Sequence, residues 1–369
     1  MPGQNPEPGP NSLSGQHPEP GQNALSGRRP VPRWNLALRA VLSVGLAVAL
    51  LWLVLPRVTG TRWSQITQVL TRLDTRDVLV LVAIWVAGLW CYTYLLTGSI
   101  PGLTHPQALT VNVAGSAASN LLPFGGAVGF ALSMGMLRSW GFSATTFTLS
   151  ALVTGIWNVL AKLILPILAV LGLLAGSDVA TGRLAGAAAI AAVALAIAVG
   201  LLAGTLSSER IAVGVGRAAQ AAGRAGLRLV RSRRSLNWDQ TVPQWRHQVI
   251  GLVRSGWVQL TFGLIGFLGS QALLLYVILR MLGADVTPAQ AFAGYAFSRL
   301  LTTLVITPGG VGITETGAAG LLTALGGDPA VCASGVLLFS GIIFFAEFPL
   351  GAAGYLIWLT RRSWRRAPA

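Results

Sequence analysis

The chain has 369 residues, of which 53% are hydrophobic and only 10% are charged, whereas an ordinary soluble domain has about 25% charged residues. With a mean hydropathy of +0.65, this composition excludes a soluble globular domain and predicts a membrane protein. The net charge of +15 does not predict a nucleic-acid partner, because the basic residues flank apolar segments and no recognition motif accompanies them. Cys91 and Cys332 stand alone in apolar segments, so we expect no disulfide, redox or metal site and no cofactor.

The first 33 residues predict a disordered cytoplasmic tail. They contain two near copies of a 12-residue unit, GQNPEPGPNSLS and GQHPEPGQNALS, which hold almost nothing apolar to bury. The apolar run that follows is too long for the core of a signal peptide. We therefore expect it to remain as a membrane anchor.

Six apolar segments predict spanning helices, each of which needs about 20 apolar residues. Three of the six contain no charged residue, whereas 139–177 is interrupted by Lys162 and 330–360 by Glu347. An amphipathic segment, 62–76, predicts a helix lying on the membrane surface. The predicted spans are 34–55, 78–97, 139–177, 184–206, 255–279 and 330–360.

A basic loop over residues 207–254 divides the chain into two membrane halves, 34–206 and 255–360, and a basic tail follows over 361–369. The loop has nine arginines and two acidic residues. It could bind anionic lipid headgroups, but we favour a simple topology signal, because cytoplasmic loops carry an excess of arginine and lysine. We therefore place the loop and both termini on the cytoplasmic side of the cell membrane.

The two halves contain related Pro/Gly motifs, NLLPFGGAVGF at 120–130 and VITPGGVGI at 305–313, and their flanking residues correspond at an offset of 182 to 186 residues. If the termini and the basic loop are cytoplasmic, segment 106–137 must begin and end inside and segment 287–325 must begin and end outside. The sequence thus predicts an all-α, polytopic helical bundle with two re-entrant hairpins in an inverted repeat.

The broken helices predict an interior binding site, because unpaired backbone groups within a membrane are tolerated only inside protein or beside water. A helix that begins after such a break presents free N–H groups, which suit the phosphate or carboxylate of a lipid headgroup. The alternative is that proline and glycine only permit kinks or close packing. The break residues are Pro123, Gly125 and Gly126 in the first half and Pro308, Gly309 and Gly310 in the second.

Ionisable residues inside apolar segments are a second set of binding candidates. Arg299 is the strongest of them, and Asn120 is a polar residue beside the first break. Lys162 and Glu347 lie 185 residues apart, which matches the repeat and predicts either an interior ion pair or a headgroup site. Glu315 falls in the first turn after the second break, where it could bind substrate or cap the helix.

The motif NLLPFGGAVG with GFS after it, together with RLLTTLVITPGGVGITETG, resembles the lysylphosphatidylglycerol synthase transmembrane-region family over about residues 35–360. These proteins are also called flippase-like membrane proteins. The resemblance implies an integral membrane domain linked to the translocation of aminoacylated phospholipids or related polar lipids. No aminoacyl-transferase domain follows residue 360, and the first motif continues as FALSMGM without the expected charge, so lipid aminoacylation is not expected.

The sequence therefore predicts a lipid translocator, not an enzyme, that moves a lipid with a polar headgroup across the cytoplasmic membrane. One alternative is a membrane-embedded lipid or glycosyl transferase, which would need acidic or histidine residues for catalysis, and only His105 lies near a motif. Another is an accessory subunit that holds a separate lipid-modifying enzyme through the basic loop. The expected partners are membrane lipids and such an enzyme.

Overall fold

The computed structural model describes residues 62–71, 73–121, 125–175, 193, 196–197, 200, 238–302, 311–361 and 364. Within these ranges the chain forms helices joined by turns, and no strand occurs among them. The predicted all-α fold is confirmed. The tail 1–33, span 34–55 and most of 184–206 and 207–254 lie outside the described residues.

Four long apolar helical segments among the described residues are long enough to cross a membrane. They are α4 (Thr75–Ser99), α7 (Ala144–Ala175), the Gln248–Met281 part of α10 (Trp238–Met281), and α13 (Pro329–Phe345) continued by α14 (Glu347–Thr360). They match the predicted spans 78–97, 139–177, 255–279 and 330–360. The chain is therefore a multi-pass membrane protein.

The last of these segments is broken where a single span was predicted. Helix α13 ends at Phe345 and α14 begins at Glu347, with Ala346 between them. Pro349 lies in the first turn of α14 and has no N–H to donate to the carbonyl four residues earlier, which favours an interruption at this point. Glu347 consequently stands at a helix end and not in the middle of a span.

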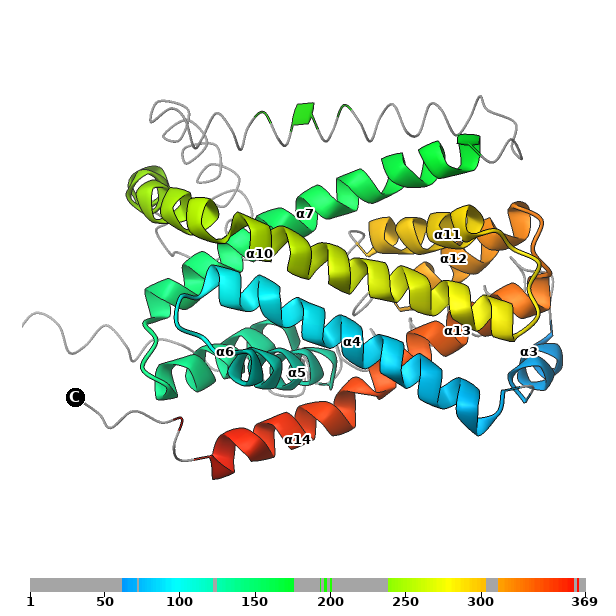
Figure 1. Cartoon of the computed structure of the whole chain (residues 1–369), viewed down its shortest axis with the longest axis horizontal. Helices are drawn as coiled ribbons and strands as arrows, with labels where there is room; N and C mark the ends of the chain where they lie inside the picture. Colours follow the sequence, from blue (N-terminus) through cyan, green and yellow to red (C-terminus); the bar gives the residue numbers. More distant parts are fainter. Residues whose placement is uncertain are drawn as a thin grey trace, which may run out of the picture.

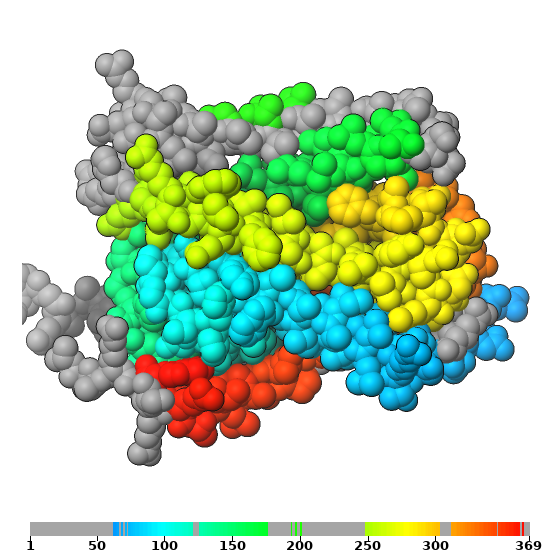
Figure 2. Space-filling model, viewed as in Figure 1, coloured from blue at the N-terminus to red at the C-terminus, as the bar shows by residue number. Residues whose placement is uncertain are grey.

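Helices α4 and α10 form the centre of the bundle and run antiparallel (Figure 1). Their backbones touch because glycines face them. A Cβ atom at Gly256 would overlap the carbonyl of Gly98, and one at Gly263 would overlap the backbone of Leu95. Figure 2 shows the two helices side by side on one face of the molecule. Their exposed apolar side chains, as expected of a surface in lipid, include Leu79, Val86, Trp257, Val258, Phe262 and Ile265.

The short helix α3 (Trp63–Leu70) precedes α4 and packs against α13. It is shorter than the predicted surface helix 62–76. Asp74 and Asp77 form a capping box that starts α4, with Asp74 Oδ1 accepting from the Asp77 N–H at 2.8 Å. These two residues therefore end the segment that the amphipathic pattern extended to residue 76.

Each Pro/Gly motif lies between two short helices that pack on one another. The first pair is α5 (His105–Leu121) and α6 (Gly125–Ser139), and the second is α11 (Pro288–Leu301) and α12 (Ile313–Ala324). Figure 1 shows the pairs at opposite ends of the long helices. Helix α5 packs against α14, whereas α11 packs against α7, so each pair contacts a long helix from the other half.

The two halves also share local structure at equivalent positions. Gly141 and Gly326 both have a positive φ, of 87° and 101°, in the turns after the paired helices. Two residues after each glycine a side chain caps the next helix: Ser143 accepts from the Thr146 N–H at 3.0 Å, and Asp328 accepts from the Ala330 N–H at 2.9 Å. Their insertion into the membrane from opposite sides stays a prediction.

Candidate functional site

Gly125 and Gly126 are the break residues that the structure describes; Pro123, Pro308, Gly309 and Gly310 lie outside the described residues. Gly125 begins α6 and is buried, and a Cβ atom there would overlap the carbonyl of Ser119 on α5. Gly126 is exposed, and nothing lies within 4 Å of the position of its Cβ atom. Close packing, the alternative to a binding role, is therefore what the geometry shows at Gly125.

Glu315 caps the helix that follows the second break. Its Oε2 accepts from the Gly312 N–H at 2.6 Å and from the Thr314 hydroxyl at 3.0 Å. Gly312 has a φ of 90°, a conformation in which a glycine is favoured. Glu315 is only 2% exposed, so its carboxylate is held by local donors at the positive end of the α12 dipole. The predicted capping role is confirmed, while direct contact with a substrate stays a prediction.

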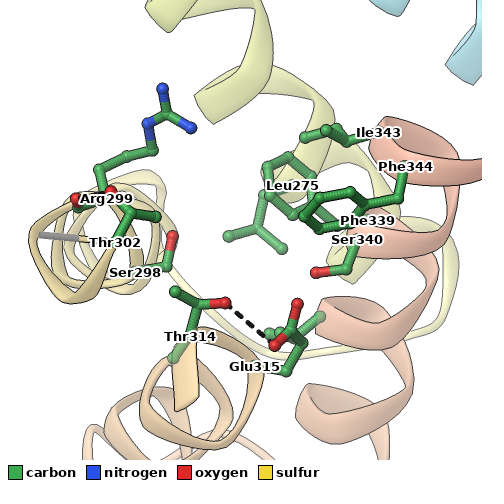
Figure 3. A pocket seen from close by; sticks show the side chains of 12 residues that line it. Leu275, Ser298, Arg299, Thr302, Thr314, Glu315, Phe339, Ser340, Ile343 and Phe344 are labelled. Carbon is green, nitrogen blue, oxygen red and sulfur yellow. Dashed lines mark hydrogen bonds between the residues drawn. The ribbon is translucent and has the colours of Figure 1, made fainter. Parts of the chain in front are cut away.

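A cavity of about 70 Å³ lies between α10, α11, α12 and α13, and Arg299 and Glu315 both line it. A void of this size holds a few water molecules and is too small for a lipid headgroup. Figure 3 shows the Arg299 guanidinium pointing away from Glu315. The remaining lining residues include Ser298, Thr302, Thr314, Phe339 and Ser340.

Arg299 is a cation without a matching anion in the described part of the chain. It lies in the last turn of α11, its Nε atom is buried, and no hydrogen-bond partner for Nε occurs among the described residues. Lys162 on α7 is half-buried, and the positive charge of Arg299 acts on its amine. Because like charges repel most strongly where water is scarce, this region favours an anion between the two side chains.

Glu347 begins α14 and is 9% exposed. Its Oε2 accepts a hydrogen bond from Asn120 Nδ2 at 3.0 Å, and the Ser116 hydroxyl is a further side-chain donor to this carboxylate. Both donors lie on α5. Asn120 therefore joins Glu347 to the end of the first broken segment, as expected of a polar residue placed beside that break.

The interior ion pair between Lys162 and Glu347 was a wrong prediction, since no such pair forms between these two described residues. The sequence offset is correct, but the packing of the helices separates the charges. Helix α7 packs against α11 and α14 packs against α5. Lys162 therefore lies near Arg299 and Glu347 lies beside Asn120.

Tyr92 on α4 is a site residue that sequence reasoning missed. The charges of Arg299 and of Glu347 both act on its hydroxyl group, and its ring packs edge-on against Phe267 at 4.8 Å between ring centroids. Tyr92 thus lies between the cationic and the anionic parts of the site. The only sequence signal was a hydroxyl within the charge-free segment 78–97, which did not show the face on which it lies.

Five helices from both halves therefore contribute to one polar region inside an apolar bundle. Lys162 and Arg299 supply positive charge, Tyr92 supplies a hydroxyl group, and Glu347 with Asn120 supplies a carboxylate and an amide. Cations of this kind can bind a phosphate, and the carboxylate and amide can bind polar groups beside it. The arrangement has the chemistry of a binding site for an amphiphilic molecule with an anionic headgroup.

The fold and this site define a polytopic α-helical membrane protein with an interior polar binding region. A family model described as the lysylphosphatidylglycerol synthase TM region matches residues 40–351. The match covers most of the chain, and the protein therefore belongs to this family, as the resemblance of its motifs predicted. No match was found among curated proteins.

Proposed function

We propose that this protein is a translocator, and not an enzyme, that moves a lipid with a polar headgroup across the cytoplasmic membrane. The observation that carries the proposal is the presence of two neighbouring cations, Arg299 and Lys162, inside the apolar bundle without an ion-pair partner among the described residues. Charges in such positions are costly and usually serve a ligand. A phosphate headgroup would offset their mutual repulsion.

The arrangement of the helices supports a route for the headgroup. The pairs α5–α6 and α11–α12 lie at opposite ends of the long helices (Figure 1), and the polar region joins residues of α5 and α11. The headgroup would pass between the pairs while its acyl chains stay in the lipid. The cavity of about 70 Å³ must open for this passage, which we assign to rocking of the two halves with both termini cytoplasmic.

Transport by the purified protein in liposomes tests the proposal. Fluorescent analogues of an anionic phospholipid, a zwitterionic phospholipid and a polyprenyl phosphate are incorporated, and their exposure to an impermeant quencher is followed with time. We expect protein-dependent movement of at least one analogue, and its loss in Arg299→Ala. Arg280→Ala is the matched control, because Arg280 is an exposed arginine in the last turn of α10. Absence of movement for every analogue would contradict the proposal.

A further inference from the structure

The first helix pair has a small hydrophobic core of its own, separate from the main core of the bundle. Its buried members come from the end of α4 and from α5, α6 and the turn after α6. Trp358 of α14 and Trp364 beyond α14 pack against this cluster. The buried members are Ile100, Leu103, Ala108, Val111, Ala114, Met136, Leu137 and Trp140. The C-terminal segment therefore covers one end of the α5–α6 pair.

Two contacts fix this cover. The indole Nε1 of Trp358 donates to the Ser139 hydroxyl oxygen at 2.9 Å, and that hydroxyl donates to the Met136 carbonyl at 2.6 Å. Beyond the helix end, Trp364 meets Trp140 at right angles with 5.5 Å between ring centroids. The ends of α6 and α14 are therefore tied together.

The outer side of this cover is positively charged. The Arg361 guanidinium lies 5.0 Å above the ring of Trp364, and Arg361 and Arg138 are both exposed. Residues 355–369 include three further arginines, which lie outside the described residues, and no acidic residue. Trp140 is 3% exposed, and its indole N–H is buried without a hydrogen-bond acceptor in the described part of the chain. The edge thus offers cations and a donor but no anion of its own.

We infer that this C-terminal edge, formed by Arg138, Trp140, Arg361 and Trp364, docks the headgroups of anionic phospholipids in the adjacent leaflet. The edge follows directly on α14, the end of an apolar segment long enough to span the membrane, where tryptophan and arginine side chains meet lipid headgroups. The docked headgroup is a bound neighbour and not the transported lipid. Occupancy holds the cover against Trp140 and so keeps α5–α6 and α14 together.

Binding of dioleoylphosphatidylglycerol to the full chain tests this inference. The protein is titrated in neutral detergent micelles, and bound lipid is counted by native mass spectrometry, with dioleoylphosphatidylcholine as the neutral comparison. One near-surface arginine contributes about 1 kcal/mol, so Arg361→Gln should weaken phosphatidylglycerol binding about fivefold. Arg280→Gln, at the other end of the bundle, should leave this site unchanged. Equal phosphatidylglycerol affinities for the two variants would overturn the inference.

Hydrogen exchange tests the effect on the helix pair. In lipid nanodiscs, phosphatidylglycerol should slow amide exchange in α5 and α6 relative to phosphatidylcholine. The slowing should vanish in Trp364→Leu and persist in Trp364→Phe, because phenylalanine keeps an aromatic ring beneath Arg361. Exchange that does not depend on the lipid in the wild type, or an edge that binds an acidic peptide but no phosphatidylglycerol, would overturn the inference. If Trp364→Leu does not fold, the exposed Arg361→Gln variant decides the matter.

Discussion

Replacing Gly125 with alanine should force apart the two helices of the first pair. The new Cβ atom would overlap the Ser119 carbonyl and would lie 2.9 Å from the Ser119 Cα atom. These neighbours are backbone atoms, so no side-chain rotation can relieve the clash, and α5 or α6 must shift. Overpacking of this kind costs about 1–3 kcal/mol. We expect a lower midpoint of thermal unfolding in detergent and slower lipid transport.

The adjacent Gly126 is the matched control for this prediction. It lies in the same helix turn, but nothing lies within 4 Å of the position of its Cβ atom. Alanine should therefore be tolerated there, and it stabilises a helix by up to about 1 kcal/mol relative to glycine. Equal unfolding midpoints for Gly125→Ala and Gly126→Ala would refute the close approach of α5 and α6.

Three further substitutions test the polar site. Tyr92→Phe removes the hydroxyl group between Arg299 and Glu347, so transport should fall while the unfolding midpoint changes little. Asn120→Ala removes a hydrogen bond to the buried Glu347 carboxylate and should cost about 1.5–3 kcal/mol of unfolding free energy, with a double-mutant cycle with Glu347→Ala measuring the coupling. Glu315→Gln should keep the cap, because an amide oxygen also accepts from a backbone N–H, whereas Glu315→Ala should lose about 1 kcal/mol.

Each of these predictions has an outcome that would contradict it. Wild-type stability in Asn120→Ala, or no coupling in the cycle, would show that the bond to Glu347 contributes nothing. Unchanged transport in Tyr92→Phe would remove the Tyr92 hydroxyl from the site. Loss of transport in Glu315→Gln at wild-type stability would show that the charge of Glu315 serves the substrate and not only the cap.

The long helices could be predicted because membrane lipid demands a continuous apolar segment. Segments 78–97 and 255–279, which have no charged residue, correspond closely to α4 and to much of α10. Helix ends were less predictable where local side chains decide them: Asp74 starts α4 and Ser143 caps α7. The break at Ala346 was missed, since a proline inside an apolar segment does not by itself distinguish a kink from an interruption.

The candidate site was only partly predictable, because hydropathy says nothing about which helices meet. Arg299, Lys162 and Glu347 stood out as ionisable residues in apolar segments, and the position of Glu315 indicated a helix cap. The partners depended on the packing of α7 against α11 and of α14 against α5. This packing brings Lys162 to Arg299, and it could not be read from a sequence offset.

The central claim is that Arg299, a buried cation without an ion-pair partner among the described residues, binds the headgroup of a transported lipid. Its most direct test is the rate of fluorescent-lipid movement in liposomes that contain equal amounts of folded wild type, Arg299→Ala or Arg280→Ala. We expect movement with the wild type and with Arg280→Ala, and none above protein-free liposomes with Arg299→Ala. Equal rates for all three proteins would contradict the claim.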